Sequence, residues 1–257
     1  MPAKWDLTMI KLEKSTTIPS SLATYGPEKA AGLIKRADSG DSDFKSEDFS
    51  HKIYADAQLK AQLIEDQHGK CAYCERKKGG DFGAVEHYRP KAGYQVSTKS
   101  KLIKPGYYWL AYEWNNLLYS CDECNTTYKR NLFPLLDENA RNITGRNIDA
   151  EVPGIINPYF SNPSEHLVFN QYVVKPRNVG GQEDKQGRIT IDSLGLDKNQ
   201  GLINDRRNAW EEYKNIELAL KIAKEINSQE MIEAVSNILA EYTSPSHEFS
   251  GMFTNQE

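Results

Sequence analysis

The sequence predicts an α+β protein in which a small module of two strands and a helix, held together by zinc, is embedded in a largely helical chain. All four cysteines lie in two Cys-x-x-Cys pairs, Cys71/Cys74 and Cys121/Cys124, a pattern typical of a closed tetrahedral zinc site. Short strand patterns lie between and beside the pairs, and residues 205–242 show helical periodicity. At 257 residues the chain can bury a substantial core.

The N-terminal segment, residues 1–55, is polar and repeatedly interrupted. A Ser/Asp-rich run covers residues 39–50. Residues that disfavour regular structure are Pro19, Gly26, Pro27 and Gly40. This composition predicts a partly irregular segment.

Residues 56–136 are expected to form the zinc-containing module. Apolar residues at helical spacing predict a short helix over 56–68, and Gly69 ends it in the usual way for a helix C-terminus. The aromatic segment 107–112 fits a helix or a strand, because its periodicity does not distinguish them.

Two strands and a helix are predicted within this module. Residues 84–88 read as a strand that Pro90 stops, and 117–120 form a second short apolar run. A helix then opens at Cys121 or Asp122. The predicted order is strand, loop, strand, helix.

The C-terminal extension, residues 137–257, is expected to serve as scaffold or partner-binding surface. Alternation at 167–174 and again at 188–191 predicts a strand pair. Residues 205–242 predict two amphipathic helices separated at Asn227-Ser228, with Ser228 as the second N-cap.

The charge is unevenly distributed. The chain carries a net charge of −4, but residues 70–130 hold eleven Lys/Arg against six Asp/Glu, so this part is +5 and the remainder −9. A locally basic module can hold phosphates, although an ordinary solvated surface explains the charge equally well.

The expected location is the cytoplasm. No apolar run reaches the roughly 18–20 residues that a membrane span needs, and residues 1–14 lack a signal-peptide pattern. Thiols stay reduced in the cytosol, so the paired cysteines favour a metal site over the alternative of two disulfides.

A candidate catalytic group lies between the cysteine pairs. Glu86 and His87 end the first predicted strand, where neighbouring side chains can converge on one site. A neutral imidazole can deprotonate water near neutral pH, and a carboxylate binds Mg²⁺ or Mn²⁺. Taken alone, the pair fits a surface histidine beside a solvated glutamate better. Asn116 before the second strand and Asn125 directly after Cys124 change that balance.

These motifs resemble the HNH endonuclease superfamily, whose members build a ββα-metal module. The family pattern is an acidic residue with His, then Asn before a short strand, then Cys-x-x-Cys running into His or Asn. The corresponding segments are Val85–Pro90, Trp114–Leu117 and Cys121–Asn125. The resemblance covers about sixty residues in order and spacing.

The resemblance implies a role for each residue. His87 would be the general base, Glu86 a ligand of a catalytic Mg²⁺ or Mn²⁺ ion, and Asn116 the residue that positions base and loop. Asn125 stands at the third position, a metal ligand that is often His, and its amide oxygen suits a hard cation. Glu86 stands where Asp is commoner, and one extra residue precedes Lys129.

The implied reaction is hydrolysis of nucleic-acid phosphodiesters to 5′-phosphate and 3′-hydroxyl ends. Candidate phosphate contacts are Arg89, Lys91, Lys129 and Arg130, each of which fits a merely solvated charge equally well. DNA is favoured as substrate, and RNA, including tRNA, stays open.

A narrower resemblance extends over most of residues 65–210, to the HNH subunit of Septu-type anti-phage systems and its retron-associated relatives. It rests on His68–Glu75, Glu86–Lys91, Trp114–Leu117, Asn131–Leu135, Ile156–Tyr159, Glu165–Leu167, Leu194–Leu196 and Arg206-Arg207. In that family an ABC/SMC-like ATPase restrains or licenses cutting, which makes the C-terminal helices a candidate docking surface. His166 fits a structural or capping role better than the site.

Two other functions compete with a nuclease effector. A non-catalytic zinc module that binds nucleic acid or protein explains the cysteines but not Glu86, His87, Asn116 and Asn125. A stand-alone restriction-type nuclease with residues 135–257 as its reader explains both.

Overall fold

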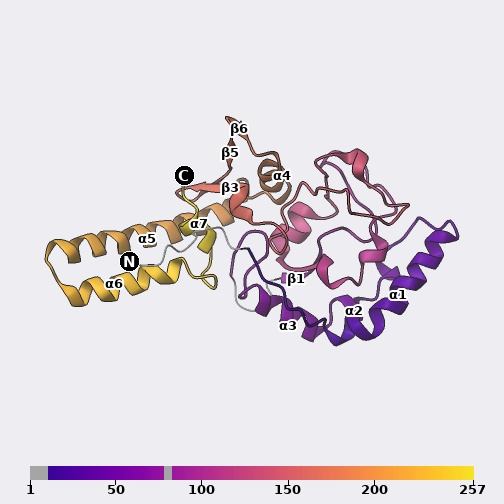
Figure 1. The fold of residues 1–257 in the computed structure, drawn as a ribbon, viewed down its shortest axis with the longest axis horizontal. Coiled ribbons are helices and arrows are strands. Elements are labelled where there is room, and N and C mark those ends of the chain that lie inside the picture. The colour runs from indigo at the N-terminus through magenta and orange to yellow at the C-terminus, as the bar shows by residue number, and fades with distance from the viewer. Residues whose placement is uncertain (1–10, 78–82) are drawn as a thin grey trace.

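A computed structural model describes residues 11–77 and 83–257. It forms an irregular α+β body from which one pair of long helices projects (Figure 1). The strands make three separate two-stranded antiparallel sheets rather than one large sheet. In these described residues no helix is long and apolar enough to cross a membrane.

The N-terminal segment is more regular than its composition predicts. Helix α1 covers Ser20–Asp38 and is followed by a 3-10 turn at Ser46–Asp48 and the short α2 at His51–Tyr54. The composition did not predict helix α1, whereas residues 11–19 and 39–45 form no helix or strand, and residues 1–10 lie outside the described part of the chain. Helix α1 continues through Pro27 because Leu22 and Leu33 are buried against the body, and that packing outweighs local propensity.

Helix α3, Ala57–Asp66, leads into the first cysteine pair as predicted. The Asp56 side chain accepts hydrogen bonds from the backbone N–H groups of Gln58 and Leu59, which caps the helix. After the helix, Gly69 takes a positive φ of 75°, a conformation that glycine adopts without strain.

The two predicted module strands are confirmed and pair with each other. Strand β1, Gly83–His87, is antiparallel to β2, Leu117–Cys121, with His87 opposite Leu117 and Gly83 opposite Cys121. The undecided aromatic segment is neither α-helix nor strand but contains a 3-10 turn, Tyr108–Leu110. A second 3-10 turn, Trp114–Asn116, precedes β2.

A helical segment follows β2, and it is π-helical over Glu123–Lys129. The hairpin and this segment lie between two hydrophobic cores. Leu117 and Tyr119 enter a core shared with α1 and α3, whereas Leu118 enters the core shared with the C-terminal half. Every residue of β2 is buried for this reason.

The C-terminal half begins with short elements. 3-10 turns at Glu138–Ala140 and Pro163–Glu165 precede the hairpin of β3, Leu167–Asn170, and β4, Val173–Pro176. A smaller hairpin pairs β5, Asn178–Val179, with β6, Gln182–Glu183.

The prediction of a strand at 188–191 is wrong, because these residues lie in helix α4, Lys185–Leu194. The Asp184 side chain caps the helix by accepting from the N–H of Gly187, and Gly195 ends it with a positive φ of 60°. Within it, Ile191 and Leu194 are buried at helical spacing, because a four-residue alternation is too short to distinguish a strand from a helix.

The C-terminal helices are confirmed. Helix α5, Gln200–Glu225, and α6, Gln229–Tyr242, run side by side as the projecting pair in Figure 1. Ser228 stands at the N-cap position as predicted, although its side chain makes no capping hydrogen bond. The short α7, Ser250–Thr254, packs back onto the body.

Candidate metal centre and polar cleft

The four cysteines form one buried cluster. Their Sγ atoms all lie within 4.8 Å of one another. Cys74 Sγ and Cys121 Sγ are 3.8 Å apart, which is about the sulfur–sulfur edge of a tetrahedron with zinc–sulfur bonds of about 2.3 Å. The donor set and its spacing therefore fit a tetrahedral thiolate-bound metal ion.

Backbone groups support the sulfur atoms. The N–H of Cys121 donates to Cys71 Sγ at 3.3 Å, and the N–H of Cys124 donates to Cys121 Sγ at 3.5 Å. Such bonds stabilise thiolates against protonation. The buried Arg76 guanidinium then joins the first cysteine turn to Glu123 and, at 2.9 Å, to Asp205 of α5. The cluster is therefore tied to the C-terminal half.

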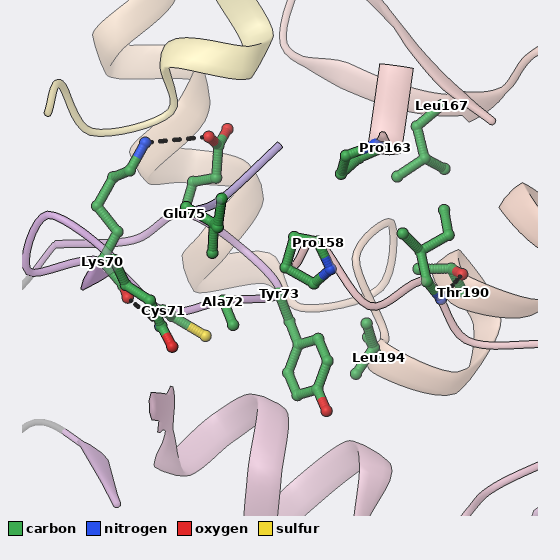
Figure 2. Close-up of a pocket in the computed structure, with 13 residues that line it drawn as sticks. Lys70, Cys71, Ala72, Tyr73, Glu75, Pro158, Pro163, Leu167, Thr190 and Leu194 are labelled. Carbon is green, nitrogen blue, oxygen red and sulfur yellow. Dashed lines mark hydrogen bonds and ion pairs between the residues drawn. The ribbon is translucent and has the colours of Figure 1, made fainter. Parts of the chain in front are cut away.

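A second polar contact between the cysteine region and the C-terminal half lies at a small cavity beside the cluster (Figure 2). In that view the Lys70 ammonium reaches the Glu75 carboxylate at 3.1 Å, next to Cys71. Lys70 also donates to Ser250 Oγ of α7 at 2.8 Å. The Lys70–Ser250 contact thus holds the C-terminal end of the chain against the first cysteine turn.

The ring of His87 is buried and oriented by a backbone carbonyl. Its Nε2 lies 2.9 Å from the carbonyl oxygen of Ala111, which can only accept, so Nε2 carries the hydrogen and Nδ1 keeps a free lone pair. The Tyr54 ring packs edge-on against it at 4.6 Å. Burial, and after it the positive charge of Lys91, holds the pKa of His87 well below its ordinary value. The imidazole is therefore neutral at neutral pH.

Glu86 forms a buried ion pair with Lys129. The Lys129 ammonium donates to Glu86 Oε1 and, at 3.2 Å, to the carbonyl oxygen of His87. Burial raises the pKa of Glu86, and Lys129 opposes that rise. Lys129 is fully buried, and its charge neutralises this carboxylate. It is therefore not a surface cation of the kind predicted to contact phosphate.

Asn116 forms hydrogen bonds with the backbone just after the end of β1. Its Oδ1 accepts from the N–H of Arg89 at 2.8 Å, and its Nδ2 donates to the carbonyl oxygens of Arg89 and Leu110, each at 3.1 Å. The N–H of Tyr88 donates to the Asn116 carbonyl oxygen at 2.9 Å. Three of these hydrogen bonds therefore hold the backbone that leaves His87, and the fourth joins Asn116 to Leu110.

Glu86, His87 and Asn125 face a common cleft. Two adjoining hollows, of about 250 Å³ and about 380 Å³, share these three residues together with Lys91. Asn125 is half-buried, and among the described residues its side chain has no hydrogen-bond partner. Arg130 is exposed and lines the smaller hollow. The cleft thus combines a neutral imidazole, carboxylate and amide oxygens, and two cationic side chains.

The remaining predicted residues lie elsewhere. Arg89 is buried in an ion pair with Glu151 and stacks over Phe133, away from the cleft. His166 pairs with Asp184 at 3.0 Å beside the start of α4. Tyr54 and the Ala111 carbonyl, which orient His87, could not be found from the sequence, because no local pattern connects them to it.

The fold and the site together define an α+β protein with a four-cysteine cluster that could hold a metal ion and a polar cleft beside that cluster. The chain matches no protein-family model. It is 31% identical over 211 residues to the Septu protein PtuB of Bacillus mycoides (strain KBAB4), which covers 77% of this chain and 70% of that protein. The chain therefore belongs to the Septu PtuB family and is a component of a Septu anti-phage defence system.

Two further relatives cover less. A Septu protein PtuB of Bacillus thuringiensis is 26% identical over 158 residues, which is 61% of this chain and 48% of that protein. The Septu protein PtuA of Bacillus mycoides (strain KBAB4) is 28% identical over 150 residues, or 58% of this chain but 20% of that protein. The PtuA match points to a second protein in the same defence system.

Proposed function

We propose that this chain is an HNH-type, metal-dependent endonuclease and the effector subunit of its Septu system. The observation that carries the proposal is the cleft where the neutral His87 ring meets Glu86 and Asn125. The β1–β2 hairpin followed by a helical segment supports a ββα-metal module, since it presents these residues in the order of the HNH motifs.

Zinc is the metal proposed for the cysteine cluster. Cys71, Cys74, Cys121 and Cys124 fill all four positions of a tetrahedral ion, so this site is structural. A bound zinc ion would contribute stability to a region that otherwise consists of turns and one short hairpin.

A second, exchangeable ion would be held by Glu86 and Asn125. Their carboxylate and amide oxygens suit Mg²⁺ or Mn²⁺, and Lys129 occupies only Oε1 of the carboxylate. When bound, such an ion would neutralise phosphate charge. Burial raises the pKa of Glu86 even beside Lys129, and a bound divalent cation would favour the charged carboxylate.

His87 is the proposed general base. Its Nδ1 takes a proton from water as the water oxygen bonds to phosphorus, the bond from phosphorus to the 3′ oxygen breaks, and the released 3′ oxygen takes a proton from solvent to become the hydroxyl. The Ala111 carbonyl keeps the other ring nitrogen protonated, so Nδ1 is available throughout. Asn116 positions the backbone after His87, and Lys91 and Arg130 face the cleft where phosphate would lie.

A cleavage assay on the purified protein tests this function. The chain should cut nucleic acid with Mg²⁺ or Mn²⁺ and not without, and His87→Ala should lose at least about a hundredfold in rate, since general-base catalysis contributes about 10²–10⁴. His68→Asn is the matched control, a histidine change outside the cleft. Normal cleavage by His87→Ala would refute the mechanism. No cleavage by any form, with tight nucleic-acid binding, would favour the non-catalytic module.

The proposed partner is an ABC/SMC-like ATPase that restrains or licenses cutting. The similarity to part of a PtuA protein supports a two-protein system. Co-purification with such an ATPase separates this effector from a stand-alone restriction-type nuclease, which needs no partner. DNA is the proposed substrate, and sequencing the ends left in activated cells distinguishes DNA from RNA.

A further inference from the structure

The N-terminal segment supplies one wall of the polar cleft. His51 and Tyr54 of α2 and Lys60 of α3 line the larger hollow, of about 380 Å³, together with Glu86 and His87. Helix α2 lies outside the segments that match the HNH motifs, and the mechanism proposed above gives this wall no part in the reaction. Its side chains are therefore candidates for a further role.

The Tyr54 ring is held between the proposed base and a cation. Its centroid lies 4.6 Å from the centroid of the His87 ring, at an interplanar angle of 70°. The Lys91 ammonium lies over the Tyr54 ring, 4.8 Å from its centroid, in a cation–π contact. Tyr112 adds a third contact, at 6.5 Å between centroids. A phenylalanine would make all three contacts, so they do not explain why this ring carries a hydroxyl.

The Tyr54 hydroxyl makes no hydrogen bond to the described residues, although partly buried tyrosines usually do. Other tyrosines of the core on which Tyr54 packs have partners. Tyr112 Oη accepts from the N–H of Ser50 at 2.7 Å. Tyr108 Oη accepts from Arg146 at 3.2 Å. The solvent-shielded side-chain atoms that lack a partner do not include Tyr54 Oη, so this hydroxyl is accessible to a molecule in the cleft.

The surroundings of this hydroxyl favour an anion that accepts hydrogen bonds. The Lys91 ammonium lines the same hollow and is a donor without acceptors. Burial raises the pKa of Tyr54, so the phenol keeps its proton at neutral pH and can donate it to a hydrogen bond. Non-bridging phosphate oxygens carry negative charge and accept hydrogen bonds strongly. A phosphate in the cleft would therefore be a suitable partner for Tyr54.

We propose that the Tyr54 hydroxyl donates a hydrogen bond to a non-bridging oxygen of the phosphate that water attacks after giving its proton to His87. Because the two rings are in contact, a phosphate whose attacking water reaches His87 also lies beside Tyr54. In the transition state, charge is spread over the non-bridging oxygens, and a fixed donor stabilises that charge. Tyr54 is then a catalytic residue that α2 adds to the site. This inference rests on the proposed nuclease function.

Replacing Tyr54 by Phe tests the hydroxyl while keeping the ring contacts. We expect Tyr54→Phe to lose about 10- to 100-fold in kcat/KM, the effect of removing one hydrogen bond to a charged group, with an unchanged thermal midpoint. Tyr112→Phe is the matched control, because it removes a hydroxyl from the same aromatic group but does not line the cleft. Its cleavage rate should equal that of the unaltered chain.

Phosphorothioate substrates distinguish a phosphate contact from a role in holding His87. Sulfur at a non-bridging position accepts hydrogen bonds more weakly than oxygen does, so cleavage by the unaltered chain should slow when sulfur replaces the oxygen that Tyr54 contacts. In Tyr54→Phe that slowing should be reduced for one of the two diastereomers. A slow Tyr54→Phe with the same sulfur effects as the unaltered chain would assign Tyr54 to positioning His87 and overturn the phosphate contact.

The two possible failures are distinct. Normal cleavage by Tyr54→Phe overturns this inference and leaves the nuclease function in place. If the unaltered chain cuts no nucleic acid with Mg²⁺ or Mn²⁺, the nuclease function itself fails, and the role of Tyr54 fails with it.

Discussion

At the residue scale, the candidate site depends largely on hydrogen bonds between side chains and backbone groups. The Ala111 carbonyl selects the His87 tautomer, and Asn116 satisfies one N–H and two carbonyl groups of the surrounding loops. Lys129 joins the Glu86 side chain to the His87 carbonyl. Each of these contacts fixes a position without taking part in the proposed proton transfer.

Replacing Asn116 by Ala should therefore reduce cleavage, because the backbone that follows His87 would no longer be held in position. The change leaves the Arg89 N–H and two buried carbonyls without partners, at about 1–3 kcal/mol for each unsatisfied group. We expect a lower urea midpoint and a loss in kcat larger than any change in KM. Asn115→Ala, at the exposed neighbouring position, should alter neither quantity. An unchanged kcat in folded Asn116→Ala protein would show that the Asn116 hydrogen bonds are not needed for cleavage.

At the element scale, the β1–β2 hairpin is short but buried on both faces. Its two strands are five residues each, too little to be stable alone. The two cores and the cysteine cluster supply the missing stability, since Cys121 ends β2 and Cys124 lies in the following π-helical segment. The proposed zinc ion would thus hold the elements that present Glu86 and Asn125.

Removing zinc should unfold this part of the chain, whereas removing magnesium should not. We expect one zinc per chain by elemental analysis, and a strong zinc chelator or Cys121→Ser should abolish it and lower the thermal midpoint sharply. Dialysis against magnesium-free buffer, the control, should stop cleavage and leave the midpoint unchanged. A metal-free protein with the native midpoint would rule out zinc as a structural element.

At the scale of the whole molecule, the α5–α6 pair extends beyond the body and carries apolar side chains on its surface (Figure 1). Leu218 and Ile222 of α5 and Ile226 at its C-cap are 55%, 45% and 59% exposed at a spacing of four residues, so they lie on one stripe. Exposed apolar surface of this kind marks interaction sites. It is the surface we propose for docking of the partner ATPase.

A charge placed in this stripe should weaken the partner complex. Ile222→Glu is expected to reduce association with a PtuA-type ATPase by tenfold or more while leaving the melting temperature and zinc content unchanged, because Ile222 is exposed in the free chain. Lys221→Glu introduces a carboxylate next to it but outside the stripe and serves as control. Binding is measured by co-sedimentation or calorimetry. Equal losses in both variants would point to general charge repulsion rather than docking.

Local patterns in the sequence explain how much of this structure could be predicted. The cysteine pairs, the two module strands and the C-terminal helices follow from spacing and periodicity, and all three were found. Helix α1 was missed because its packing outweighs Pro27. Residues 188–191 were misread because an alternation of four residues is too short to distinguish a strand from a helix. The division at residues 55 and 136 and the catalytic roles stay predictions.

The sequence by itself determined that four thiolates gather and that Glu86, His87, Asn116 and Asn125 occupy the positions of the HNH motifs, because spacing and order are local properties. Only the tertiary structure decided what surrounds them. Lys129 and Arg89 turn inward to Glu86 and Glu151, and the Ala111 carbonyl meets His87, because buried charges and ring nitrogens need partners that come from distant parts of the chain. The contact of the Tyr54 ring with His87 is likewise visible only once the chain is folded.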